Sequence, residues 1–355
     1  MPTLRWGVLG TSFISRVLCD AIDKSETGEL VAIGSHSSGN VDFFVGQYPG
    51  ITVYETKAAD SSISGLEQLI ADQNIDAIYI GLPNALHKEW IIKCLKAGKH
   101  VLCEKPFVLN LHEMEEVLSI CKTTPSLICA EALMNLYHPF MLDLKRTISE
   151  QIGEIVSFNA TYTCNIAGVA NANFGGAIRN LGCYPVSLIR FLLGEEPTEI
   201  IIHSGKIGED DNIRKASMTL KFPGNIQATI STADDEPAQS LEIFSSCKIV
   251  GTLGTIEILT NPWLPGEKNS VLIQDPDGEC KKMNFTASNS LYTYEIDAVG
   301  SAVFARNSSY HRTEPQPTTL VSSAFSKGNV AILEEWEAKT RHFVRRSLSS
   351  INSMQ

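Results

Sequence analysis

The chain has 355 residues, of which 43% are hydrophobic and 19% are charged, and its formal net charge is −11. This length exceeds what one hydrophobic core usually organises, so we expect two domains. The negative net charge argues against a nucleic-acid partner, because binding nucleic acid requires clustered Lys and Arg. No apolar run approaches the ~18–20 residues that span a bilayer, so we also expect no membrane partner.

Strand-like and helix-like segments alternate along the N-terminal part. The first strand-like run, over residues 6–10, begins so close to Met1 that it leaves no room for a signal peptide, and we therefore expect a cytoplasmic protein. Apolar strands separated by helices indicate a doubly wound parallel sheet covered on both faces, which is a Rossmann fold. Further strands are expected over residues 30–33, 75–80, 100–103 and 126–130, and helices over residues 13–22, 66–70, 85–97 and 114–121.

The pattern changes after about residue 150. Strand-like runs with turn signals between them indicate a large open, mainly antiparallel sheet with one exposed face. We therefore expect an α/β protein with a Rossmann domain at residues 1–125 and an α+β domain at residues 126–355, whose last two helices can pack back on the first domain. The expected strands cover residues 158–163, 200–203, 216–222, 226–232 and 241–244, and the expected helices cover residues 185–193, 294–306 and 327–341.

The nine cysteines are scattered and include no Cys-x-x-Cys pair. Cys103 and Cys129 lie in apolar strand-like runs, where a buried free thiol behaves as a small hydrophobic group. We expect all nine to be structural and reduced, and we expect no metal site.

The first strand-to-helix turn is a candidate phosphate-binding site. A dinucleotide needs a tight turn after the first strand and a helix N-terminus that faces its pyrophosphate. Here Gly10 keeps the first glycine, but Ser12 and Ser15 stand where the second and third are usual. The alternative is an ordinary turn that Ser12 caps. In the phosphate-binding interpretation, the contacting residues are Gly10, Thr11, Ser12, Phe13 and Ile14.

The end of the second expected strand indicates which dinucleotide binds. Sites for NAD usually carry Asp or Glu there for the ribose hydroxyls. Residues 34–38 contain no carboxylate, and Ser35 and His36 can hydrogen-bond to a 2′-phosphate. We therefore predict NADP as the cofactor, with NAD as the alternative. His36 can equally be a solvated loop histidine.

A third strand end adds further cofactor candidates. Loops at the carboxyl ends of parallel strands line the ligand crevice. The loop after residues 78–80 contains Leu82, Pro83 and Asn84, and His87 follows three residues later. We assign all four residues to the cofactor site, although capping of the next helix alone could explain Asn84.

The tripeptide Glu104-Lys105-Pro106 ends another expected strand in the same crevice. A Lys–Pro bond can be cis, which would fix the direction of the lysine. A lysine that is partly desolvated at such a strand end can exchange a proton near neutral pH. We predict that Lys105 is catalytic and that Glu104 and Lys105 contact the cofactor. The alternative is a surface lysine at the end of a strand.

Ordered motifs along nearly the whole chain resemble a known family. They are residues 6–15, 104–106, 131–139, 175–185, 251–257 and 294–298. Together they are similar to the Gfo/Idh/MocA family, the glucose-fructose oxidoreductase and inositol dehydrogenase group. The Gly-Cys-Tyr-Pro stretch at residues 182–185 looks most like the dihydrodiol and xylose dehydrogenases.

The resemblance implies hydride exchange between a nicotinamide and a hydroxyl-bearing carbon of a sugar or sugar-like cyclic alcohol, with Lys105 at the reacting oxygen. It implies that Tyr184 passes a proton. It also implies a homodimer or homotetramer formed through the second-domain sheet. The residues expected to contact this small-molecule substrate are Lys105, Asn135, Tyr137, Asn180 and Tyr184.

Asn180 departs from the family pattern, which generally has Asp four positions before a His or Tyr on the catalytic helix. The i, i+4 spacing puts Asn180 and Tyr184 on one helix face. An amide can orient a substrate hydroxyl, but it cannot accept a proton. Two hypotheses therefore remain. In the first, Lys105 and Tyr184 relay the proton while Asn180 orients the substrate. In the second, the protein binds the dinucleotide with little or no turnover, as a sensor or partner subunit.

Overall fold

The computed structural model describes residues 3–36, 41–56, 64–167, 175–236, 243–306 and 320–352. The chain forms two compact units. Unit 1 contains Met1–Tyr137 and Asn289–Lys327, and unit 2 contains His138–Ser288 and Gly328–Gln355. This division differs from the expected boundary after residue 125, because the strand that follows this boundary pairs within the sheet of unit 1.

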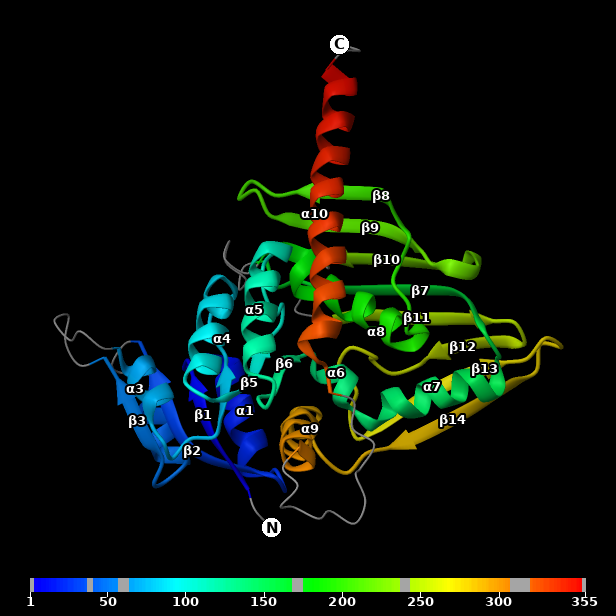
Figure 1. Cartoon of the computed structure of the whole chain (residues 1–355). Coiled ribbons are helices and arrows are strands. Elements are labelled where there is room, and N and C mark those ends of the chain that lie inside the picture. The colour runs from blue at the N-terminus through cyan, green and yellow to red at the C-terminus, as the bar shows by residue number, and fades with distance from the viewer. Residues whose placement is uncertain are drawn as a thin grey trace. The chain divides into compact units, whose positions relative to one another are not determined.

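Unit 1 is built on a six-stranded sheet with the order β3-β2-β1-β4-β5-β6, and every neighbouring pair is parallel (Figure 1). The strand order reverses between β1 and β4, which is where a Rossmann sheet places its ligand crevice. The predicted doubly wound sheet is confirmed, although the sequence pattern missed β3. The strands are β1 (Leu4–Leu9), β2 (Gly28–Ser35), β3 (Thr52–Glu55), β4 (Ala77–Ile80), β5 (His100–Glu104) and β6 (Cys129–Ala132).

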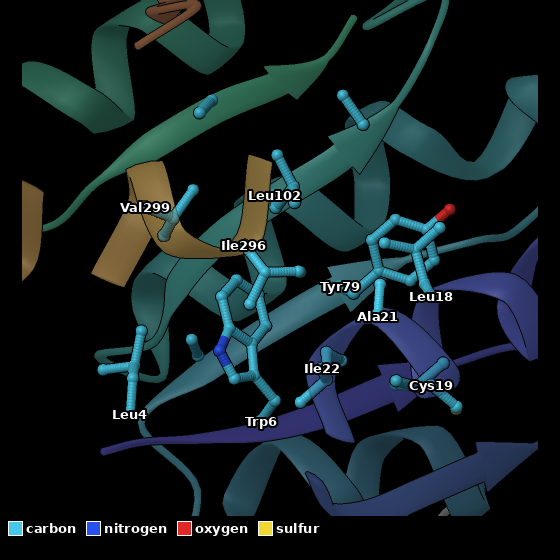
Figure 2. Close-up of a cluster of buried hydrophobic side chains, with 14 of the residues drawn as sticks. Leu4, Trp6, Leu18, Cys19, Ala21, Ile22, Tyr79, Leu102, Ile296 and Val299 are labelled. Atoms are coloured by element: carbon cyan, nitrogen blue, oxygen red, sulfur yellow. The ribbon is translucent and has the colours of Figure 1, made fainter. Parts of the chain in front are cut away.

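Helices cover both faces of this sheet. On one face, Ile22 of α1 and Ile296 of α9 pack with Trp6 of β1 in a single buried cluster, which Figure 2 shows. On the other face, a Cβ at Gly7 would lie 2.7 Å from Leu69 of α3, so this helix packs closely over β1. The helices of unit 1 are α1 (Phe13–Asp23), α2 (Asp42–Gln47), α3 (Gly65–Ala71), η1 (Asn84–Leu86), α4 (His87–Lys96), α5 (Leu111–Thr123), α6 (Met134–Tyr137) and α9 (Leu291–Arg306).

Although α9 comes after the strands of unit 2, its contacts place it in unit 1. Oδ1 of Asp297 accepts hydrogen bonds from the Ser25 hydroxyl at 2.5 Å and from the Thr27 hydroxyl at 2.9 Å. These two residues form the turn between α1 and β2, so Asp297 ties α9 to the first βαβ element.

Unit 2 contains an eight-stranded sheet with the order β14-β13-β12-β11-β7-β10-β9-β8. All neighbouring pairs are antiparallel except β7 and β10, which run parallel, so the prediction of a mainly antiparallel sheet is confirmed. The sequence pattern missed the three strands from β12 to β14, and residues 241–242 of the last expected strand lie outside the described ranges. The strands are β7 (Ile155–Cys164), β8 (Glu199–Ile207), β9 (Ile213–Lys221), β10 (Gln227–Ala233), β11 (Ile243–Gly251), β12 (Gly254–Ile258), β13 (Lys268–Gln274) and β14 (Cys280–Thr286).

The two faces of the unit 2 sheet differ in burial. Along β7, Phe158 and Tyr162 are buried while Asn159 between them is exposed. The buried face carries α8, and α10 packs beside it, extending beyond the predicted residues 327–341 at both ends. The helices are α7 (Pro139–Gln151), the π turn η3 (Ile178–Gly182), α8 (Cys183–Leu193), η4 (Pro223–Asn225) and α10 (Ser323–Asn352). Within the described ranges, no helix has both the length and the apolarity that crossing a membrane requires.

Candidate functional site

The turn after β1 joins two strand ends in unit 1. Gly10 has a φ of 100°, and a Cβ there would lie 2.8 Å from the carbonyl oxygen of Gly81, so the position requires glycine. The hydroxyl of Ser12 accepts the backbone N–H of Ser15 at 3.3 Å and thereby caps α1. Ser12 also donates to the Gly81 carbonyl at 3.3 Å. The first turn of α1 therefore lies at the carboxyl ends of β1 and β4. Phe13 begins this turn, and its side chain is 81% exposed.

The end of β2 reaches the same turn. The backbone N–H of Gly10 donates to the Gly34 carbonyl at 2.9 Å, and the next residue, Ser35, is buried. His36, which follows, is exposed. Ser37 and Ser38, the last two residues of the stretch 34–38 that lacks a carboxylate for the ribose, lie outside the described residues.

The loop after β4 differs in one respect from expectation. Asn84 is buried and begins η1, but its side chain caps neither η1 nor α4, whose capping residues are Pro83 and Leu86. Asn84 is therefore not the N-cap residue of either helix, and its contact with the cofactor stays a prediction.

His87 joins the β4 loop to the lysine tripeptide. Its Nδ1 lies 2.9 Å from the carbonyl oxygen of Pro106, and its Nε2 lies 2.8 Å from that of Leu82. Burial lowers the pKa of His87, although the two carbonyls favour the protonated ring. A neutral ring donates to one carbonyl at a time. Because His87 is fully buried, its part in a cofactor site would be to hold these two loops in place.

The lysine tripeptide is held from two sides. The Lys105–Pro106 bond is cis. Oε1 of Glu104 accepts the Tyr79 hydroxyl at 2.6 Å, and its Oε2 accepts the Lys105 backbone N–H at 3.1 Å. On the other side of the bond, the backbone N–H of Phe107 donates to Oε1 of Glu131 at 3.0 Å. The side chain of Lys105 is partly exposed at this strand end.

Buried acids lie around this tripeptide in unit 1. Glu295 of α9 is 0% exposed, and neither of its carboxyl oxygens has a hydrogen-bond partner among the described residues. Burial, reinforced by the nearby Glu104 carboxyl, raises the pKa of Glu295 well above its usual range. Burial also raises the pKa of Glu104, against the opposing hydrogen bond from Tyr79. The surroundings of Glu295 therefore favour its protonated form.

The predicted substrate residues of α6 are fully or almost fully buried. Asn135 is 0% exposed, and neither its amide oxygen nor its amide nitrogen has a hydrogen-bond partner in the described part of the chain. The hydroxyl of Tyr137 donates to the Glu131 carbonyl at 2.8 Å, which fixes α6 to the end of β6. Substrate contact by these two side chains stays a prediction.

In unit 2, the predicted catalytic helix begins with the π turn η3. Asn180 lies in this turn, whereas Tyr184 lies in the α-helix that follows, and both are buried. π turns occur frequently at functional sites. The Tyr184 ring packs edge-on against Tyr162 at 5.6 Å between centroids, and Tyr162 packs against Trp263 at 5.9 Å.

Contacts with α10 fix the π turn. A Cβ at Gly182 would lie 2.6 Å from the ring of Trp336, so the helix can follow this path only with glycine there. Arg179 makes a bidentate ion pair with Glu337, with distances of 2.9 and 2.6 Å. Both contacts lie within unit 2 and position the backbone that carries Asn180 and Tyr184.

The predicted residues therefore form two groups. Unit 1 brings together the turn of Gly10 and Ser12, the β4 loop with His87, and the tripeptide of Lys105, while Asn180 and Tyr184 belong to unit 2. Among the described residues, no group of three or more His, Cys, Asp or Glu side chains could hold a metal ion.

Tyr79 and Glu131 support the lysine tripeptide, although neither was predicted from the sequence as a support. Each carried a signal, because a phenol or a carboxylate inside an otherwise apolar buried strand needs a polar partner. Glu295 was missed as well, since its helix comes after the strands of the other unit.

Two family models match the chain. Residues 4–131 match the oxidoreductase family with an NAD-binding Rossmann fold, and residues 141–257 match the GFO/IDH/MocA C-terminal domain. The chain is 30% identical over 288 residues to an uncharacterized oxidoreductase, ORF334, of Rhizobium meliloti, covering 79% of each chain.

Two further relatives belong to the branch that the sequence resembled. A trans-1,2-dihydrobenzene-1,2-diol dehydrogenase of Danio rerio is 27% identical over 318 residues, covering 85% of this chain and 89% of that protein. A D-xylose 1-dehydrogenase (NADP(+)) of Haloferax volcanii is 26% identical over 309 residues, covering 84% and 89%.

A solved structure shares the fold. The 3-ketoreductase KijD10 from Actinomadura kijaniata, in complex with NADP and TDP-benzene, has a TM-score of 0.76 at 22% identity, covering 94% of this chain and 96% of that chain. The matched domains, the relatives and the shared fold confirm the resemblance seen in the sequence: this chain belongs to the Gfo/Idh/MocA oxidoreductase family.

Proposed function

We propose that this protein transfers hydride between NADP(H) and a hydroxyl-bearing carbon of a sugar or sugar-like cyclic alcohol, with Lys105 and Tyr184 relaying the proton. The observation that carries the proposal is the position of Lys105 at the carboxyl end of β5. Glu104, His87 and Glu131 hold the backbone on both sides of it.

The residues of unit 1 fit a dinucleotide. The glycine at position 10 lets the turn after β1 pack against the Gly81 carbonyl, which places this turn at the carboxyl ends of β1 and β4. The turn faces the start of α1, whose N–H groups favour a pyrophosphate. Ser35 and His36 end β2 without a carboxylate, which supports NADP over NAD. When bound, the nicotinamide supplies the hydride chemistry.

Residues of this chain would supply positioning and proton transfer. The ammonium of Lys105 would bind the reacting oxygen and stabilise the charge that develops on it. The phenol of Tyr184 would exchange the proton of that oxygen, and the amide of Asn180 would orient a neighbouring hydroxyl. Holding the reacting carbon at ~3–3.5 Å from its partner contributes several kcal/mol.

A panel of aldoses, inositols and cyclic diols, assayed with NADP⁺ and NAD⁺, tests this proposal. Lys105→Met should lower kcat/KM by at least ~100-fold, a larger factor than its loss of NADPH affinity measured by fluorescence. Lys96→Met, on the outside of α4, is the matched control. Undiminished turnover in Lys105→Met would exclude the assigned role.

Asn180 favours a second candidate, a protein that binds the dinucleotide with little or no turnover. This candidate requires NADPH binding without hydride transfer to any member of the panel, and no activity gained in Asn180→Asp. Activity that appears or rises at least ~10-fold in Asn180→Asp would support the enzyme and identify the amide as the limiting group.

We also propose that the protein forms a homodimer or homotetramer through the exposed face of the unit 2 sheet. Phe244 on β11 is 57% exposed and stands opposite Thr163 of β7, so a large apolar side chain is exposed on this face. Light scattering after size exclusion should show an oligomer that Phe244→Asp dissociates. A wild-type monomer would refute this proposal.

A further inference from the structure

Arg16 of α1 contacts Phe43 of α2 within unit 1. The guanidinium carbon of Arg16 lies 4.3 Å from the centroid of the Phe43 ring, which is a cation–π contact. Phe44, the next residue, is fully buried in the same hydrophobic cluster as Leu18 of α1. Because this packing fixes α2 against α1, the ring of Phe43 holds the exposed Arg16 guanidinium at a defined place on the surface of unit 1.

We propose that Arg16, held by the ring of Phe43, binds the 2′-phosphate of NADP and gives the protein a preference for NADP over NAD. This inference rests on the proposed binding of a dinucleotide at the turn of Gly10. It adds a specificity-determining residue that lies in a helix and not at the end of β2, where such residues are usual.

The contact joins two helices whose first turns are tied to the end of β2. The N–H of Gly10, in the turn before α1, donates to the Gly34 carbonyl of β2 at 2.9 Å. Arg16 is the fourth residue of α1, about one turn from the helix N-terminus that would receive the pyrophosphate. The other helix, α2, begins at Asp42, seven residues after Ser35 at the end of β2. In this fold the ribose 2′ position faces the end of the second strand, and an arginine near this strand end accommodates a 2′-phosphate.

The first βαβ element contains few cations that could bind a phosphate. Residues 34–48, which begin at the end of β2 and include α2, contain no Lys or Arg. In residues 6–48, the Lys and Arg residues are Arg16 and Lys24. Lys24 caps the far end of α1 and pairs with Asp20 at 2.7 Å. Arg16 is therefore the cation that this element offers to a phosphate near the end of β2.

The Arg16 guanidinium is available to an anion. It makes no ion pair with an acid in the part of the chain that the structure describes, and the first turn of α1 contains no acidic residue. A guanidinium uses the face of its plane for an aromatic ring and the N–H groups at its edge for phosphate oxygens. The ring of Phe43 also restricts the rotamers of Arg16, so less side-chain entropy is lost when the phosphate binds.

Fluorescence titration of the full-length protein with NADPH and with NADH tests the proposal. Arg16→Gln should raise the dissociation constant of NADPH by at least ~10-fold, because a charge-assisted contact is lost, while that of NADH stays nearly unchanged. Lys24→Gln is the matched control, since it removes one positive charge from the far end of the same helix, and it should change neither constant. Phe43→Leu should weaken NADPH binding less than Arg16→Gln does, because the guanidinium remains but loses its aromatic support.

Competition experiments isolate the phosphate itself. Adenosine 2′,5′-bisphosphate and 5′-AMP differ only in the 2′-phosphate. The bisphosphate should displace NADPH from the wild type at the lower concentration, and added potassium chloride should reduce the difference, because salt screens an exposed charge. In Arg16→Gln the difference should shrink by the same factor as the preference for NADPH. A circular dichroism melt shows that this variant is folded.

Three results would overturn the proposal and leave the proposed hydride transfer standing. They are an unchanged NADPH dissociation constant in Arg16→Gln, an equal weakening of NADPH and NADH in this variant, and a wild type that binds NADH more tightly than NADPH. The second result would assign Arg16 to the part that the two dinucleotides share. A wild type that binds neither dinucleotide would instead overturn the proposed function, and this inference with it.

Discussion

The hydroxyl of Tyr79 lies 2.6 Å from Oε1 of Glu104, and the same carboxyl accepts the backbone N–H of Lys105 through its other oxygen. Tyr79 belongs to β4 and Glu104 to β5, so this hydrogen bond links two neighbouring strand ends. Burial raises the pKa of Tyr79 well above its usual range, which keeps the phenol protonated and able to donate. The catalytic candidate is therefore positioned through a buried phenol.

Tyr79→Phe should lower the free energy of unfolding by ~1–3 kcal/mol, the usual cost of leaving a buried hydrogen-bonding group without its partner. Urea denaturation measures this change. Tyr48→Phe, whose ring packs against the same hydrophobic cluster, is the matched control and should cost less. Equal losses in the two variants would show that the Glu104 hydrogen bond does not stabilise the fold.

Gly10→Ala should weaken NADPH binding. The new Cβ would lie 2.8 Å from the Gly81 carbonyl at a φ of 100°, so the turn must open or shift. We expect a rise in the NADPH dissociation constant of at least ~10-fold, about 1.4 kcal/mol, by fluorescence titration. Gly98→Ala is the matched control, because Gly98 has a φ of 78° with nothing near its Cβ position. An unchanged dissociation constant in Gly10→Ala would place the dinucleotide elsewhere.

The sequence predicted the elements whose pattern is local. The strand ends of unit 1 and the glycine of the first turn follow from apolar runs and turn residues. It did not predict β12 to β14, whose short strands mix buried and exposed residues and need their neighbours to define the sheet. The candidate site also contains residues with a local sequence signal and residues that only tertiary packing brings together. Lys105 carries a local motif, whereas the supports Tyr79, Glu131 and Glu295 come from three separate elements that only tertiary packing joins.

Gly182→Ala should reduce activity as well as stability. The added methyl would meet the Trp336 ring at 2.6 Å and displace the turn that precedes Tyr184, at an expected cost of ~1–3 kcal/mol for overpacking. Gly194→Ala, at the other end of α8, has a φ of 72° and open space. It should lower stability through backbone strain but leave kcat unchanged. If both variants keep wild-type kcat, the position of the π turn has no effect on the reaction.

Asp234→Asn should remove a pH dependence of stability that has a defined window. Burial raises the pKa of Asp234 from 3.8 to about 6, against the opposing charge of Arg214. Between pH 3.8 and about 6 the native state therefore binds more protons than the unfolded chain. The contribution of Asp234 to the free energy of unfolding is fully present below about pH 4 and is lost as the pH rises to about 6. The stability of the wild type relative to Asp234→Asn should therefore fall across this window by up to about 1.4 kcal/mol per pH unit.

Asp76→Asn supplies a control of opposite sign for this measurement. Although burial opposes it, the hydrogen bonds and charge of Arg5 lower the pKa of Asp76 below 3.8. The contribution of Asp76 to the free energy of unfolding is therefore present above pH 3.8, the pKa of this group in the unfolded chain, and is lost as the pH falls below it. Urea denaturation at pH 4, 5, 6 and 7 should show that the stability of the wild type relative to Asp234→Asn falls as the pH rises. Over the same range, the stability of the wild type relative to Asp76→Asn should stay constant or increase. Parallel curves for the two variants would show that Asp234 is ionised in the native state throughout, with Arg214 outweighing its burial.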